Sequence, residues 1–500
     1  MRQYTILFIL FISIRLINGQ TSDVYLKGVE RDKYDLEEFE KRGERELENE
    51  YSAFQTKEDS IWMNFLKKEW TAYDINIKKK PLSNPKPKDA PVYELPAKPV
   101  LPKDGENSIK VKSQSTTADT SHNEKRTVFK SRSKRYTSSV DTANMTFYGC
   151  DISLPYDEQL SKCTLREISE NGISKFWNEM NGCNYLPVLK RLMGYKTSLQ
   201  LNDYGYFQLT KLLSEQLYKP NTNESRLQTW FLMIRSGYGA RVGYKNDTIA
   251  LLLPIEQQLY SHIYMSVENR KYYLFPEVSG KSINTYSKDL SRSTHNIDMS
   301  IHNPMDFKGR KVEKKIIMDF EGNTYPLTIA YNPDLVNFYK SYPQTDLNVY
   351  FGASPSTIAT ETLIANLKTY TVRMSEEQIL NFLLHFVQTT FHYKNDIDQF
   401  GSEKAFFAEE VFYYPFSDCE DRAILFSYLV RSLTKMEVIG LRYPNHVATG
   451  VTVNTNIQGD YVKYKNVTYI IADPTYINAK VGIPMPSYKN IAPQVILISK

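Results

Sequence analysis

Three residues near the C-terminus have the types and the order that thiol catalysis requires. They are Cys419, His446 and Asp473, and the interval between the first two equals that between the last two. A thiol becomes a nucleophile when a histidine takes its proton, and a carboxylate can orient that histidine and stabilise its charged form. Each residue alone has an ordinary structural explanation, since a first-turn cysteine, a lone histidine and an aspartate before proline are common without catalysis. Their joint order and context favour a catalytic Cys-His-Asp triad.

Cys419 lies in the stretch FSDCEDRAILFSYLVRSL (416–433), which has the pattern of an amphipathic helix. Ser417 and Glu420 fit the S-x-x-E capping box, so we expect the helix to begin at Ser417 or Asp418 with Cys419 in its first turn. The unpaired N–H groups and the helix dipole there favour a thiolate, whereas the neighbouring acidic side chains oppose it. One apolar face follows at spacings of three and four: Ala423, Phe426, Leu429, Val430 and Leu433.

Three strands are predicted after this helix, in the segments EVIGLRY (437–443), HVATGVTV (446–453) and VTYIIADPTY (467–476). His446 opens the second strand, and Asp473 ends the third, where the following proline stops it. Because the strands follow one another at hairpin distances, antiparallel neighbours would place His446 and Asp473 at adjacent positions along one sheet edge.

The motifs DCEDRAILFSYLVRSL, NHVATGV and YIIADPTY together resemble the transglutaminase-like superfamily, over about residues 375–485. The resemblance implies an α+β fold with a papain-like core, in which a cysteine-bearing helix packs on an antiparallel sheet. It also implies that Cys419 is the nucleophile, His446 the base and Asp473 the third member of the triad. Many relatives carry an aromatic residue two places after the histidine, where this chain has Ala448. This departure concerns the shape of the acceptor or leaving-group side of the pocket and leaves the triad unaffected.

The implied activity is acyl transfer at amide bonds of protein or peptide substrates, by a cysteine peptidase or amidase or by a transglutaminase-type acyltransferase. Hydrolysis is favoured over cross-linking, because many bacterial relatives are thought to cut. The backbone N–H of Cys419 is a natural oxyanion donor, and a second donor would come from residues 406–416 or 390–394. The alternative is a non-catalytic binding or assembly protein of the cell envelope that retains the transglutaminase-like fold.

No cofactor or metal is expected, since the chain has no C-x-x-C or H-E-x-x-H spacing. Nucleic acid is not expected as a partner either, because the net charge is only +5 and the basic residues follow no nucleic-acid-binding motif. The expected partners are a protein or peptide substrate and a component of the cell envelope.

The N-terminus predicts export. Residues 1–19 have a basic start, an apolar run and a plausible cleavage point, as in a signal peptide, and the run is shorter than the ~20 residues of a membrane span. We therefore expect a periplasmic or cell-envelope protein without a transmembrane span, similar to exported proteins of Bacteroidetes-type bacteria. The four cysteines are too few for a disulfide scaffold, although two of Cys150, Cys163 and Cys183 could pair.

Composition divides the rest of the chain into four parts. We expect a long charged helix over residues 20–78, as a stalk or a coiled coil, and a disordered Pro/Lys/Ser-rich linker over 79–139. A globular α+β domain over 140–330 would precede the catalytic transglutaminase-like domain over 331–500.

The domain over residues 140–330 is predicted to contain a degenerate copy of the same fold. Residues 225–247 align with 420–446, which places Asn223 at the position of Cys419 and Asp247 at that of His446. The segment KYYLFPE (271–277) matches VTYIIADP but has no aspartate before its proline. A copy that kept the packing and lost the chemistry would show the same strand order, whereas chance similarity of two helix-strand units would not.

Overall fold

The structure is a computed structural model that describes residues 57–79, 86–94 and 139–498. Within these ranges the chain is α+β, as expected, with helices and mainly antiparallel sheets. The described residues from 65 onward belong to one compact unit, and residues 57–64 belong to another. None of the helices in these ranges combines the length and the hydropathy that a membrane crossing requires. The predicted signal peptide, residues 1–19, lies outside the described residues.

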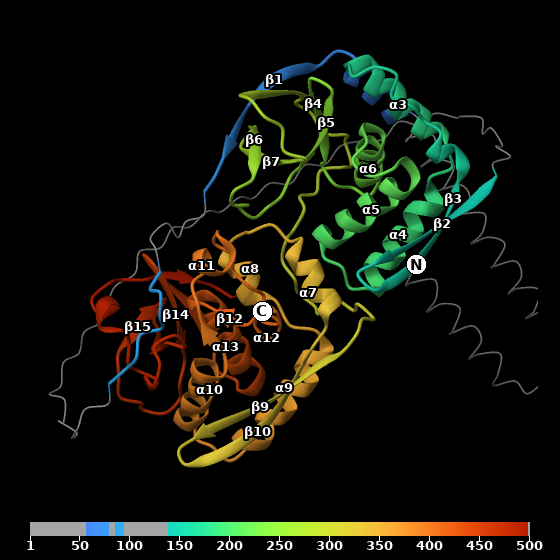
Figure 1. Ribbon diagram of the computed structural model, residues 1–500. Helices are drawn as coiled ribbons and strands as arrows, with labels where there is room; N and C mark the ends of the chain where they lie inside the picture. Colours follow the sequence, from blue (N-terminus) through green and yellow to red (C-terminus); the bar gives the residue numbers. More distant parts are fainter. Residues whose placement is uncertain (1–56, 80–85, 95–138, 499–500) are drawn as a thin grey trace, which may run out of the picture. The chain divides into compact units, whose positions relative to one another are not determined.

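Strand β1 and residues 139–310 form what we term the N-terminal half (Figure 1). Its elements are β1 (Trp70–Ile77), β2 (Val140–Phe147), β3 (Cys150–Asp157), η1 (Glu158–Ser161), α3 (Glu170–Gly182), α4 (Leu186–Ser198), α5 (Asp203–Tyr218), α6 (Asn223–Arg235), β4 (Arg241–Lys245), β5 (Thr248–Leu253), β6 (Ile263–Val267), β7 (Arg270–Phe275) and β8 (Ser282–Tyr286). Strands β2 and β3 form a hairpin, and the other six strands close into a barrel in the order β1-β6-β7-β5-β4-β8.

Residues 311–498 form the C-terminal half, which carries the predicted triad. Its elements are β9 (Val312–Phe320), β10 (Asn323–Tyr331), α7 (Pro333–Lys340), α8 (Leu347–Gly352), α9 (Thr357–Thr371), α10 (Glu376–Thr390), β11 (His392–Tyr393), α11 (Asp396–Phe400), α12 (Glu410–Tyr413), β12 (Phe416–Ser417), α13 (Cys419–Leu433), β13 (Val438–Tyr443), β14 (His446–Val451), β15 (Tyr461–Tyr464), β16 (Val467–Ala472), η2 (Pro486–Tyr488) and β17 (Gln494–Ile496).

An antiparallel sheet in the order β15-β16-β14-β13-β17 is the centre of the C-terminal half. Helix α13 packs on β13 and β14, and α10 packs against α13. The predicted helix and the three predicted strands are confirmed as α13, β13, β14 and β16. The helix is buried from Cys419 to Val430 on all sides, whereas its pattern had predicted one buried face.

The barrel repeats this sheet strand for strand. Removing β1 leaves the order β6-β7-β5-β4-β8, which matches β15-β16-β14-β13-β17 in both chain order and neighbours, and α6 packs on β4 and β5 as α13 packs on β13 and β14. The registers agree as well. The matched pairs are Lys245–Thr248 with Tyr443–His446, Leu251–Phe275 with Thr449–Ala472, and Val267–Arg270 with Tyr464–Val467. The predicted strand order is thus confirmed.

This register corrects the alignment made from the sequence. Thr248, and not Asp247, takes the position of His446, because each is the first residue of its strand and pairs with the last residue of the strand before. Pro276 follows β7 where Asp473 follows β16. Asn223 begins α6 as Cys419 begins α13, as expected.

Two predicted boundaries differ from the structure. The long helix expected over residues 20–78 is wrong for residues 70–77, which form β1, while residues 57–66 are helical and the rest lies outside the described ranges. Tyr73, Ile75 and Ile77 alternate with polar residues, a strand period, and the first two pack on the barrel core. The hairpin β9–β10 packs on α9 and α10, so it accompanies the C-terminal half, although the boundary was placed at 330.

The linker expected over residues 79–139 is also wrong in part. Residues 86–94 are packed within the compact unit, and Lys86 is buried. Cys163 and Cys183, two of the three cysteines that could pair, have sulfur atoms 3.8 Å apart, both as free thiols.

Candidate functional site

Cys419 is the first residue of α13, with Asp418 as its N-cap. The backbone N–H of Asp418 donates to Asp421 Oδ2 at 3.1 Å, so this carboxylate closes the first turn. The box expected from Ser417 and Glu420 is therefore displaced by one residue. As a result, the carboxylate of Glu420 contacts Cys419 and Lys86 and takes no part in the cap.

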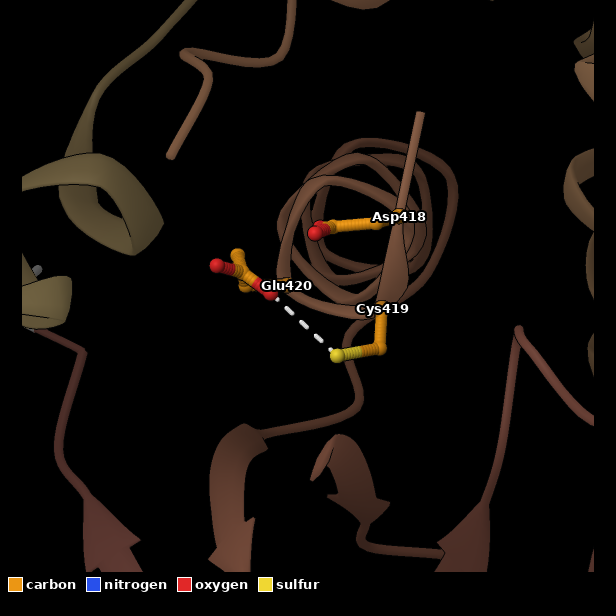
Figure 2. A group of neighbouring side chains, drawn as sticks. All are labelled: Asp418, Cys419 and Glu420. Carbon is orange, nitrogen blue, oxygen red and sulfur yellow. Dashed lines mark hydrogen bonds between the residues drawn. The ribbon is translucent and has the colours of Figure 1, made fainter. Parts of the chain in front are cut away.

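The sulfur of Cys419 faces that carboxylate. Figure 2 shows the thiol, which donates to Glu420 Oε2 at 3.2 Å. Cys419 is 1% exposed. Burial, followed by the charge of Glu420, raises the pKa of the Cys419 thiol well above its usual value, while the Lys86 ammonium acts in the opposite direction. In this arrangement the sulfur is a thiol and not a thiolate.

His446 and Asp473 are brought together as predicted. His446 Nε2 lies 2.8 Å from Asp473 Oδ2, and both side chains are buried. The other oxygen of Asp473 accepts the backbone N–H groups of Thr475 (3.0 Å) and Tyr476 (3.2 Å). One carboxylate thus performs both roles considered for it, because it forms the turn with one oxygen and holds the histidine with the other.

Further side chains fix this pair. The ring of His446 stacks on that of Tyr488, with centroids 5.0 Å apart and 15° between the planes. The hydroxyl of Tyr488 donates to Asn445 Oδ1 at 2.5 Å. Gln388 of α10 donates to the carbonyls of Asp473 (3.1 Å), Tyr476 (2.8 Å) and Ala479 (3.1 Å). The turn that carries Asp473 is therefore held from a separate helix.

Cys419, the predicted nucleophile, hydrogen-bonds to Glu420 and not to this pair. Helix α13 packs on β14, the strand that His446 opens, so Cys419 and His446 belong to one packed unit. Among the residues that the structure describes, no hydrogen bond joins the two side chains, since the thiol is donated to Glu420. The His446–Asp473 pair is assembled, and the sulfur is turned to a different partner.

Comparisons with protein-family models, with curated proteins and with solved structures found no match. The interpretation of the site therefore rests on its own residues and on the strand order.

Four carboxylates beside Cys419 form what we call the acidic pocket: Asp396, Glu403, Asp418 and Glu420. Oxygen atoms of Asp396, Glu403 and Glu420 lie within 4.8 Å of one another, close enough to share a cation. The Lys86 ammonium occupies this position and forms ion pairs with all four. They involve Asp418, Glu420 (2.6 Å), Glu403 (3.0 Å) and Asp396 (3.6 Å). A lysine thus supplies the positive charge here.

Sequence reasoning missed Lys86, Gln388 and the pocket. Gln388 had a detectable signal, because a glutamine within the apolar run of α10 needs buried partners. The pocket had a weaker one, since acidic residues at 418, 420 and 421 surround a cysteine in a helix that is otherwise buried. Lys86 had none, because it lies in a Pro/Lys-rich stretch that has the composition of a linker.

The matching position in the N-terminal half has no thiol. Asn223 Oδ1 accepts the backbone N–H of Ile249 at 3.0 Å, and its amide donates to the carbonyl of Asp247 at 3.0 Å. Thr248 and Pro276 stand where the histidine and the aspartate would be. Here the first residue of the helix ties down the β4–β5 turn.

Proposed function

We propose that this chain is an exported thiol enzyme with a transglutaminase-like, papain-like core, which transfers acyl groups from amide bonds of protein or peptide substrates in the cell envelope. The observation that carries the proposal is the 2.8 Å hydrogen bond between His446 and Asp473, in a sheet on which the helix that begins at Cys419 packs. A paired imidazole and carboxylate beside a first-turn cysteine is the constellation that thiol acyl transfer needs.

The reaction follows from the atoms of His446 and Cys419 that can take part in proton transfer and attack. His446 Nε2 is directed to Asp473, which leaves Nδ1 to take the thiol proton. The Cys419 thiolate attacks the amide carbonyl, and the N–H groups at the start of α13 stabilise the oxyanion that forms. The imidazolium then protonates the leaving amine, and the acyl group remains on the sulfur until an acceptor releases it. Water as acceptor gives hydrolysis, which we favour, and an amine gives cross-linking.

The resting arrangement requires one movement before this reaction. The thiol is donated to Glu420, so the sulfur must leave that carboxylate and meet the imidazole. Catalytic hydrogen bonds often form fully only with substrate bound. We therefore interpret the arrangement as a closed form of the enzyme.

The N-terminal half supports the assignment of the fold. The same order and register of five strands after a helix occur twice in the chain, and we infer a duplication in which one copy lost the thiol, the histidine and the aspartate. Its buried core positions are partly retained, with Ala250 and Tyr272 in the barrel where Ala448 and Tyr469 stand in the sheet. In this inferred duplication, the N-terminal copy kept core packing positions and lost the three residues of the triad.

A second candidate function, a non-catalytic binding or assembly protein, is favoured by the burial of Cys419 and its raised thiol pKa. Alkylation with iodoacetamide near neutral pH, read at Cys419 by peptide mass spectrometry, separates the two. An assembled triad predicts slower alkylation in His446→Ala than in the wild type, because the imidazole promotes thiolate formation. Equal rates at Cys419 in both proteins would favour the scaffold.

A further inference from the structure

Residues 86–94, which we call the Lys86 segment, cross the candidate site. At one end, the backbone N–H of Tyr93 donates to the carbonyl of Ile477 at 2.8 Å, and that of Ile477 donates to the carbonyl of Pro91 at 2.9 Å. Val92 and Ile477 form a parallel β-bridge. Ile477 follows closely after Asp473 in the same turn region. In Figure 1 the segment, in light blue, runs along the C-terminal half.

At the other end, the segment reaches the N-terminus of α13. The Lys86 ammonium enters the acidic pocket, where Asp418 and Glu420 flank Cys419 on both sides. The hydroxyl of Tyr393 donates to the carbonyl of Pro87 at 3.1 Å. The segment is thus anchored both beside the predicted nucleophile and beside the turn that holds the predicted third member of the triad.

The lysine is held by charge and not by apolar contact. Burial, the largest single cause, works against its charged form, but the neighbouring anionic groups, Glu420 and Asp418 first among them, together raise the pKa of Lys86 well above its usual value. Buried ion pairs add little net stability but are costly to break on one side only. The pocket therefore discriminates strongly between a segment that carries an ammonium group here and one that does not.

The rest of the segment binds as a peptide ligand would. Pro87, Lys88, Asp89 and Val92 are exposed, so much of the segment lies on the surface, and Tyr93 is the member that packs against the core, beside Tyr476. Backbone pairing with an exposed edge, combined with a pocket for one side chain, is a recurring way for proteins to hold extended peptides.

We propose that the Lys86 segment is a built-in peptide ligand, which occupies the Cys419 site in cis and keeps it closed until it is displaced. The site then takes extended peptides that place a lysine ammonium in the acidic pocket, and such a peptide competes with the segment. This inference rests on the proposed function, because it assigns a regulation to the same site.

The test is alkylation of the native full-length chain with iodoacetamide, read at Cys419 by peptide mass spectrometry. Lys86→Ala removes the charged anchor, so we expect the alkylation rate at Cys419 to rise at least about tenfold, in spite of the higher thiol pKa that loss of the ammonium by itself causes. Lys88→Ala is the matched control, since this lysine is exposed in the same segment. Its loss should change the rate by less than about twofold. Equal rates in wild type and Lys86→Ala would overturn the proposal.

A synthetic peptide with the sequence of residues 86–94 provides a second test of the same proposal. Added to Lys86→Ala, it should restore slow alkylation at Cys419, and the same peptide with norleucine for its first lysine should not. Protection by both peptides, or by neither, would contradict a lysine-selective site.

Hydrogen exchange of the wild type needs no variant, and it decides the matter if Lys86→Ala disturbs the whole fold. The amides of Tyr93 and Ile477 should exchange together and before those of α13, as for a displaceable ligand. Exchange of all three together would show an integral part of the fold and overturn the inference.

These readouts are independent of turnover. Suppose that alkylation at Cys419 is faster in Lys86→Ala but proceeds at the same rate with and without His446. That result would support the Lys86 segment as a closing ligand and contradict the proposed function. Catalysis through Cys419, combined with equal alkylation rates in wild type and Lys86→Ala, would support the proposed function and contradict the closing role of the segment.

Discussion

Replacement of Glu420 by glutamine should activate the sulfur of Cys419. Glu420 Oε2 lies 3.2 Å from this sulfur, and its charge is the second cause, after burial, of the raised pKa of the thiol. Glutamine keeps the size of the side chain and removes the charge. Lys86 keeps its ion pairs with the other three carboxylates, so its ammonium remains near the sulfur and acts in the same direction.

The expected size follows from this distance. Two unit charges 3.2 Å apart interact by about 5 kcal/mol at an effective dielectric constant of about 20, and by about 1.3 kcal/mol in bulk water. Since one pKa unit corresponds to about 1.4 kcal/mol, the pKa of the Cys419 thiol should fall by between about one and four units in Glu420→Gln.

The assay is the pH dependence of the iodoacetamide alkylation rate at Cys419, whose inflection reports the thiol pKa. Glu410→Gln is the matched control, because Glu410 is another buried carboxylate with a lysine partner, Lys404 at 2.7 Å. The inflection should move to lower pH in Glu420→Gln and stay in place in Glu410→Gln. An unchanged or higher inflection in Glu420→Gln would refute the electrostatic reasoning.

Further predictions concern four single side chains. Burial and the charges of neighbouring carboxylates raise the pKa of Asp396 to about 8, against about 4 in the unfolded chain, so its stabilising effect is present below pH ~4 and is lost as the pH rises to ~8. Asp396→Asn should therefore flatten the decline of the urea-unfolding free energy over that window, and an unchanged slope would count against it. Asp473→Asn should lower kcat by about 10²–10⁴-fold without abolishing it, because the imidazole remains but loses its charged partner; full activity in a steady-state assay would exclude the assigned role. Asn223→Ala should cost about 1–2 kcal/mol of stability, measured by urea unfolding, and leave kcat unchanged. Cys419→Ala should abolish turnover and keep the fold. Loss of turnover in Asn223→Ala would contradict the inference that the N-terminal copy is not catalytic.

The elements that carry His446 and Asp473 were predictable because their signals are local. Short runs rich in Val, Ile, Thr and Tyr mark β14 and β16, and a proline ends the segment after Asp473. β14 and β16 pair as antiparallel neighbours although β15, which was not predicted, lies between them in the chain. The start of β14 therefore lies beside the end of β16, where His446 and Asp473 were expected to meet. The helix start needed a choice between two overlapping capping patterns, and the pattern one residue further on was the one adopted.

The parts that could not be predicted depend on contacts between distant residues. Lys86 and Asp418 are 332 positions apart, and the composition around Lys86 is that of a linker. The strand β1 closes a barrel whose other strands begin far along the chain, and its charged surroundings favoured a helix. Gln388 binds three carbonyls of a turn that lies outside its own helix. In each case the stabilising partner is invisible to a local pattern.

Covalent trapping tests the central claim most directly. The wild type and Lys86→Ala are incubated with p-nitrophenyl acetate, a small activated acyl donor, and the adduct is mapped by mass spectrometry. The account predicts an acetyl group on Cys419 that forms faster in Lys86→Ala, is absent in Cys419→Ala and forms slowly once His446→Ala is introduced. No adduct at Cys419 in either protein, or one that forms equally fast without His446, would contradict it.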